Sequence, residues 1–150
     1  MAVRAELFEQ GLRFNEQVGP RGRGRIAGSE AELLSRLKEA GHQQIYVPSA
    51  VVQHVLRPEM VSPSWLRRRG YGHGRGLAWW GLRGEYPSIA GVPRFAFRSA
   101  ADELLRCLIA GVKRKHAEAL EAQVRCCMWV GYILELLKLR FGQPDNAEVR

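Results

Sequence analysis

Residues 28–54 constrain the fold of this chain most, because a helical pattern in this stretch is followed at once by two β-type runs. Ser29 and Glu32 have the spacing of a capping box, in which each side chain bonds a free amide at the helix start. An apolar helical face and then a glycine stop follow, formed by Leu33, Leu34, Leu37 and Gly41. The two β-type runs are residues 44–47, closed by Pro48, and residues 50–55. The stretch therefore predicts an α/β unit.

The segments before this unit are short and weakly patterned. Residues 1–3 are predicted to end a strand, and residues 6–10 to make one helical turn. Residues 19–28 are rich in glycine and arginine and fit no periodicity, so a loop is expected there.

A second helix is predicted to begin at Ser62 and Pro63, with serine as the cap and proline at the first helical position. Four glycines at alternate positions weaken this helix, so we expect it to be short or broken: Gly70, Gly72, Gly74 and Gly76. A loop with two prolines is expected over residues 84–94.

The C-terminal third carries two apolar stripes with a polar stretch, residues 113–121, between them. The stripes are formed by Leu104, Leu105, Leu108, Ile109 and Val112, and by Met128, Trp129, Ile133, Leu134, Leu136 and Leu137. Two antiparallel helices or one long helix would fit this pattern, and we favour two. The tail after Gly142 is predicted to be disordered.

The chain of 150 residues has the size of one domain and a formal net charge of +8, so acidic partners are expected. Three cysteines without metal-ligand spacing are interpreted as reduced, buried thiols. No signal peptide or membrane-spanning run is present in the sequence. These features predict a cytoplasmic protein, free or held peripherally on the inner face of the membrane.

Several segments, in order, resemble the second half of the catalytic domain of family 2 glycosyltransferases, which have the GT-A fold. Residues 28–37, G-S-E-A-E-L-L-S-R-L, resemble the family's G-E-D-x-E-L-x-x-R-L. Residues 41–54, G-H-Q-Q-I-Y-V-P-S-A-V-V-Q-H, resemble its G-x-x-I-x-Y-x-P-x-A-x-V-x-H, and F-N-E at residues 14–16 resembles its F-D-E. The resemblance is strong over roughly the first half of the chain and loose beyond it.

The resemblance implies a mostly helical α/β fragment, with a partial GT-A (Rossmann-like) half-domain followed by a C-terminal helical hairpin. The expected divisions are an acceptor-side half at residues 1–83, a linker loop at 84–98, an amphipathic helical region at 99–141 and a disordered tail at 142–150. The expected partners are a nucleotide-sugar donor and a glycan or lipid-linked acceptor.

The resemblance also implies roles for four residues. Glu30 stands at the family's catalytic Asp, where a carboxylate deprotonates the acceptor hydroxyl; without that role it is an acid that the helix dipole favours. His54, Arg69 and Arg75 are expected to contact the donor diphosphate, and His54 to approach the Mg²⁺ or Mn²⁺ ion that the family uses. Structural or solvated roles are the alternatives for these three.

The metal-binding D-x-D motif of the family's donor half does not occur in these 150 residues. We therefore expect Met1 to be an internal start, or the sequence to be that of a truncated gene or a gene-call fragment, and the chain to be inactive alone. Two non-catalytic alternatives remain. One is a nucleic-acid-binding module, suggested by basic clusters with aromatic residues between them but less favoured, since no recognised nucleic-acid motif accompanies them. The other is a membrane-surface or partner-binding helical module, suggested by Trp79, Trp80 and the C-terminal helices.

Overall fold

The computed structural model describes residues 2–19, 26–80 and 85–142, and these residues are mostly helical. The helices are α1 (Ala5–Glu9), α2 (Ser29–Glu39), the short 3₁₀ helix η1 (Pro58–Val61), α3 (Pro63–Trp80), α4 (Arg94–Val112) and α5 (His116–Phe141). The one sheet in the described ranges is an antiparallel hairpin of β1 (Ser88–Ile89) and β2 (Val92–Pro93).

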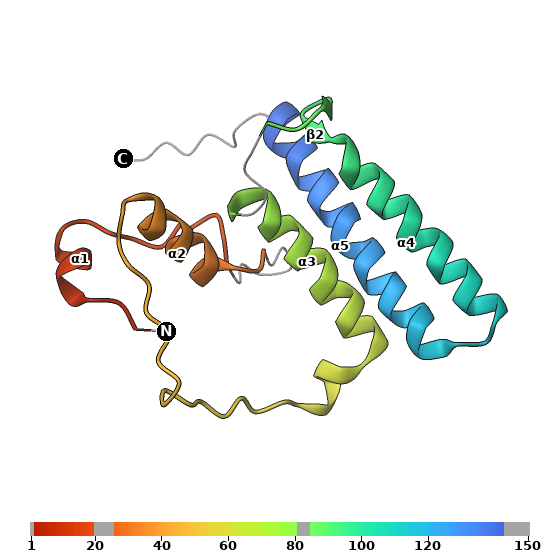
Figure 1. Cartoon of the computed structure of the whole chain (residues 1–150), viewed down its shortest axis with the longest axis horizontal. Coiled ribbons are helices and arrows are strands. Elements are labelled where there is room, and N and C mark those ends of the chain that lie inside the picture. The colour runs from red at the N-terminus through yellow and green to blue at the C-terminus, as the bar shows by residue number, and fades with distance from the viewer. Residues whose placement is uncertain (1, 20–25, 81–84, 143–150) are drawn as a thin grey trace.

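Three long helices, α3, α5 and α4, lie side by side, with α5 in the middle (Figure 1). The smaller helices α1 and α2 lie on the α3 side of this layer, and α2 contacts α3. The C-terminal helices therefore form the antiparallel pair that the two apolar stripes predict, which confirms the preference for two helices. The tail after Gly142 lies outside the described residues.

The core lies where α5 meets α4 and β2, around Val92, Ala96 and Tyr132. Aromatic rings extend this core in a chain of edge-to-face contacts. The ring centroids are 5.2 Å apart for Tyr86 and Phe95, and 5.9 Å apart for Phe95 and Trp129. Aromatic pairs favour this geometry because the positive ring edge meets the negative face.

Helix α3 is continuous over 18 residues, so the prediction of a short or broken helix is wrong. Its N-terminal signal is confirmed, because the Ser62 hydroxyl accepts a hydrogen bond from the Trp65 amide at 3.3 Å. The glycines lie buried within the helix and let two backbones approach. A Cβ at Gly70 would lie 2.6 Å from the Val124 carbonyl oxygen, and one at Gly74 would overlap that of Met128. The packing gain with α5 therefore outweighs the low helix propensity of glycine.

Helix α2 is present as predicted, but its capping box is not. Gly28 is the N-cap, with φ of +104°, and no side chain caps the helix. Ser29 is therefore the first helical residue, one position too late to act as the cap. The Glu32 amide donates to the Gly28 carbonyl at 2.8 Å, and the Glu32 side chain points to a different partner.

No strand forms over residues 44–47 or 50–55, so both strand predictions are wrong for the structure as described. The segment between α2 and η1 is irregular, and its large apolar side chains are 79% to 87% exposed at Ile45, Tyr46, Val51, Val52 and Val55. A strand needs a neighbouring strand for its backbone hydrogen bonds, and no described segment pairs with this one.

The N-terminal predictions are partly confirmed. Helix α1 lies where a helical turn was expected, whereas residues 2–4 do not form a strand. Residues 20–25 of the expected loop lie outside the described residues, and a single antiparallel bridge joins Gly19 to Ile26.

Helix α4 begins five residues before the Ser99 start that the sequence suggests. The expected linker, residues 84–98, therefore contains the hairpin and the first turn of α4; residue 84 lies outside the described residues. The hairpin turn is formed by Ala90 and Gly91, with φ of 51° and 80°. Positive φ at both positions is typical of the two-residue turns that match strand twist.

Candidate functional site

The N-terminal end of α2, which carries Glu30, is fixed against the C-terminal half of α3. The Ala27 amide donates to the Gly72 carbonyl at 3.1 Å. A Cβ at Gly28 would overlap the Trp80 indole, so glycine is required by space as well as by its positive φ. Both contacts hold the start of α2 in one place on α3.

Glu30 projects from this helix start as an exposed carboxylate. Its described side-chain contact is the Ser29 hydroxyl, which donates to Oε2 at 3.2 Å. The carboxylate is therefore available to an external hydroxyl group. This position also fits the simpler interpretation, in which the helix dipole favours an acid in the first turn.

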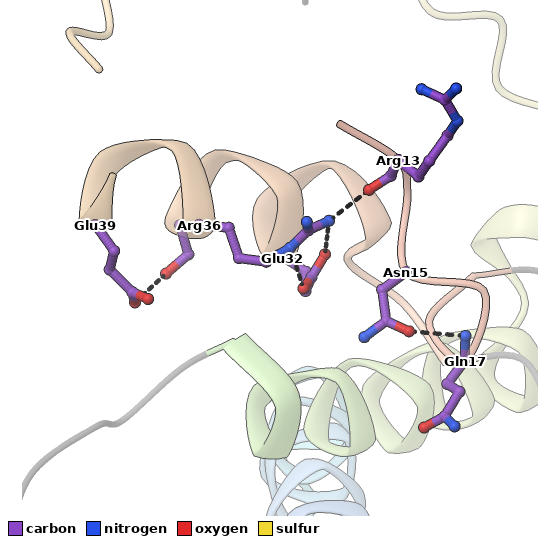
Figure 2. Close-up of polar contacts among 7 residues, drawn as sticks. Arg13, Asn15, Gln17, Glu32, Arg36 and Glu39 are labelled. Carbon is purple, nitrogen blue, oxygen red and sulfur yellow. Dashed lines mark hydrogen bonds and ion pairs between the residues drawn. The ribbon is translucent and has the colours of Figure 1, made fainter. Parts of the chain in front are cut away.

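Glu32, two residues further on, is buried and holds Arg36 rather than a substrate. Arg36 donates from Nε and Nη2 to the two Glu32 oxygens, at 2.7 and 3.1 Å. Arg36 Nη2 also donates to the Arg13 carbonyl at 2.7 Å, so the pair ties α2 to the segment before it (Figure 2). In the same segment, the Gln17 amide donates to the Asn15 side chain at 2.9 Å (Figure 2). This network positions α2.

His54 and Arg69, expected at the donor diphosphate, are both exposed and lie on different elements. His54 is in the irregular segment between α2 and η1, whereas Arg69 is on α3, with its guanidinium 5.2 Å from the centroid of the Trp65 ring. Among the described residues, no hydrogen bond or ion pair joins Glu30 to either of them.

Arg75 is placed differently from the expectation. Its Nε donates to Glu135 Oε2 of α5 at 2.6 Å, and the Trp79 indole donates to the other Glu135 oxygen at 3.0 Å. The side chains of Arg75 and Glu135 are only 16% and 5% exposed. This guanidinium is therefore engaged inside the α3–α5 interface, where it neutralises a buried carboxylate.

Two open cavities of about 500 and 390 Å³ lie in the described structure. The larger lies between α4 and α5 near their connecting turn, and the smaller lies between α1 and α2. Neither is lined by any of Glu30, His54, Arg69 and Arg75. Neither cavity therefore gathers these four side chains into one pocket.

The described part of the chain contains no group of three metal-ligating side chains. His54 alone does not fit a divalent cation, which needs several oxygen or nitrogen ligands. The cysteines are free thiols, Cys107, Cys126 and Cys127, and each is half-buried. Burial, followed by the neighbouring Cys127, Cys107 and Glu103, raises the pKa of the Cys126 thiol.

Sequence reasoning missed two side-chain pairs that the structure brings together, Glu135 with Trp79 and Arg36 with Glu32. One signal was available, because Glu135 is the one acid in the largely apolar run of residues 126–139. A carboxylate at such a position is buried only with a cationic or hydrogen-bonding partner.

Comparisons with known proteins return no match, whether with family models, curated proteins or solved structures. Across the described ranges, no helix is both long and apolar enough to cross a bilayer.

Proposed function

We propose that this chain is the acceptor-side part of a nucleotide-sugar-dependent glycosyltransferase, with a partial GT-A domain, and that it acts with a donor-binding part supplied from outside these 150 residues. The observation that carries the proposal is the exposed apolar segment between α2 and η1. The segment has the composition of a buried strand, but its large apolar side chains are 51% to 87% exposed. A sheet from a donor-binding part would cover these side chains and pair their backbone.

The proposed reaction transfers one sugar with inversion. The acceptor hydroxyl loses its proton to Glu30, and its oxygen attacks the anomeric carbon of the donor. The bond between that carbon and the diphosphate oxygen breaks, and the nucleoside diphosphate leaves with the electron pair. Support for Glu30 comes from its exposed carboxylate and from the fixed start of α2, which limits how far the base can move.

Diphosphate contact is assigned in the proposal first to His54 and Arg69, whose side chains are exposed. A diphosphate at Arg75 would have to compete with Glu135 for the guanidinium. Any divalent cation would need ligands from the donor-binding part. The acceptor is a glycan or a lipid-linked sugar, as the resemblance implies.

The test uses the chain tagged at its natural locus and purified under mild conditions from its own host. Release of nucleoside diphosphate is measured with a panel of UDP-, GDP- and dTDP-sugars and a host glycan or lipid extract as acceptor. We expect release from at least one donor, and a loss of about 100-fold in Glu30→Gln. Glu30→Asp should retain more activity because the carboxylate remains.

The matched control is Glu6→Gln, which removes an exposed acid from the first turn of α1 and should leave the rate unchanged. Absence of release from every donor would overturn the transferase proposal. Release that is equal in Glu30→Gln and in the unaltered chain would remove Glu30 as the base.

A further inference from the structure

Helix α4 carries a second apolar face, directed away from α5. Its large side chains are 38% to 86% exposed and follow a spacing of i, i+7, i+8, i+11, i+12 and i+15. Positions with this spacing share one side of a helix. The residues of this α4 outer stripe are Phe97, Leu104, Leu105, Leu108, Ile109 and Val112. Ile109 stands at the edge of the stripe, where it also lines the cavity between α4 and α5.

The inner face of α4 is already used in packing. Ala96 and Ala110 are buried. The Ala100 carbonyl accepts a hydrogen bond from the Cys126 thiol of α5, at a distance of 3.8 Å. Figure 1 shows α4 at the outer edge of the three-helix layer, with no described element beyond it. The α4 outer stripe therefore takes no part in the packing of α4 on the core.

Single exposed leucines are common on soluble proteins, but a continuous row over four helical turns marks an interaction surface. The turn that ends this row adds positive charge. Val112, 86% exposed, is followed by Lys113, Arg114 and Lys115. Lys115 pairs with Glu118 at 2.6 Å, whereas no described carboxylate pairs with Lys113 or Arg114.

The helical pair of α4 and α5 carries a net positive charge as a whole. Residues 94–141 contain nine Lys and Arg side chains against five Asp and Glu side chains. An anionic lipid surface offers both an apolar layer for leucines and negative headgroups for such cations. A symmetric pairing of two α4 stripes would bury the leucines but would leave the basic turn without opposite charge.

We propose that α4 lies flat on an anionic membrane surface, with the α4 outer stripe inserted among the acyl chains and the Lys113–Arg114–Lys115 turn on the headgroups. This inference rests on α4 and its turn alone and does not depend on the transferase proposal. Trp79 and Trp80 are not part of the surface. Trp79 donates to Glu135, and Trp80 packs over Gly28.

The test is flotation of the full chain with vesicles of phosphatidylcholine alone and of phosphatidylcholine with phosphatidylglycerol. We expect binding to the anionic vesicles that falls as salt is raised, since exposed charges are screened. Leu104→Glu with Leu108→Glu should weaken binding by about tenfold or more, because two charged groups would have to enter the apolar layer. Lys113→Glu with Arg114→Glu should weaken binding to a similar extent, about tenfold.

The matched control is Val51→Glu with Val52→Glu, two exposed apolar residues outside α4, which should float like the unaltered chain. Circular dichroism establishes that each variant is folded. Failure of the unaltered chain to bind anionic vesicles at low salt would overturn the proposal, as would equal binding by the stripe variant. A dimer in solution that the stripe substitutions convert to a monomer, without vesicle binding, would instead identify a second copy as the occupant.

Discussion

Arg75 and Glu135, 60 residues apart in sequence, form an ion pair across the α3–α5 interface, with 2.6 Å between Nε and Oε2. Trp79, one helical turn beyond Arg75, donates to the second Glu135 oxygen at 3.0 Å. Both carboxylate oxygens therefore have partners in a place that water scarcely reaches. The pair therefore joins α3 to α5 through buried, charge-assisted hydrogen bonds.

Glu135→Ala is expected to destabilise the fold by about 3 kcal/mol, because the buried Arg75 cation would lose the carboxylate that neutralises it. The measurement is urea unfolding followed by circular dichroism. The comparison is Arg75→Met with Glu135→Leu, which removes both charges at similar volume and should be closer in stability to the unaltered chain. A loss below about 0.5 kcal/mol in Glu135→Ala would show that Arg75 finds water or another acceptor.

Local signals were sufficient for most helices. The Ser62–Pro63 start of α3, the α2 leucines and the two C-terminal stripes each predict a helix that the structure contains. The glycines of α3 misled the prediction because helix propensity describes an isolated helix. Only the approach of α5, with Val124 and Met128 carbonyls against Gly70 and Gly74, makes those glycines favourable.

The strands and the candidate site depend on contacts that the sequence does not encode locally. Residues 44–47 and 50–55 have strand composition, but pairing requires a neighbour, and none is described. Glu30 and His54 were grouped by resemblance, and among the described residues no hydrogen bond or ion pair joins them. Arg75 was predicted from the resemblance and from its charge, and neither reveals that a buried Glu135 lies opposite.

Gly74→Ala tests the close approach of α3 and α5. The added methyl group would overlap the Met128 carbonyl, which is backbone and cannot rotate away, so the helices must separate. We expect a loss of about 2 kcal/mol or more.

The matched control is Gly111→Ala in α4, where the added methyl meets no atom within 4 Å. That variant should gain roughly 0.5–1 kcal/mol, because alanine is the better helix former. Thermal unfolding of both variants measures the difference, and a Gly74→Ala protein as stable as the unaltered chain would refute the packing argument.

Stability is expected to fall at alkaline pH because burial raises the pKa values of Cys126 and Tyr132. Burial is the larger cause for each, with neighbouring Cys127 adding to it for Cys126 and Tyr86 for Tyr132. Folding therefore favours the protonated forms. The stability that the two protonated groups contribute is fully present below their ordinary pKa values, 9.0 for Cys126 and 10.0 for Tyr132. It is lost as pH rises from these values through the raised pKa values of the folded protein.

The measurement is urea unfolding between pH 7 and pH 11. Tyr132→Phe and Cys126→Ala together should flatten the decline, although each also changes packing. The quantity to compare between the double variant and the unaltered chain is therefore the slope of the unfolding free energy against pH. An unchanged slope would assign the alkaline loss of stability to other groups.

Hydrogen exchange tests whether the segment between α2 and η1 is an unpaired strand. The amides of Ile45, Tyr46 and Val52 make no backbone hydrogen bond in the described structure, whereas the Tyr132 amide lies inside α5. In the purified chain, the three loop amides should exchange quickly and the α5 amide slowly. In the assembly purified from the host, the same three amides should become protected if a sheet has added to them.

Protection already present in the isolated chain, together with a dimer by sedimentation, would mean that a second copy pairs with this segment. Rapid exchange in both preparations would argue against any sheet pairing here, and with it against the observation that carries the transferase proposal.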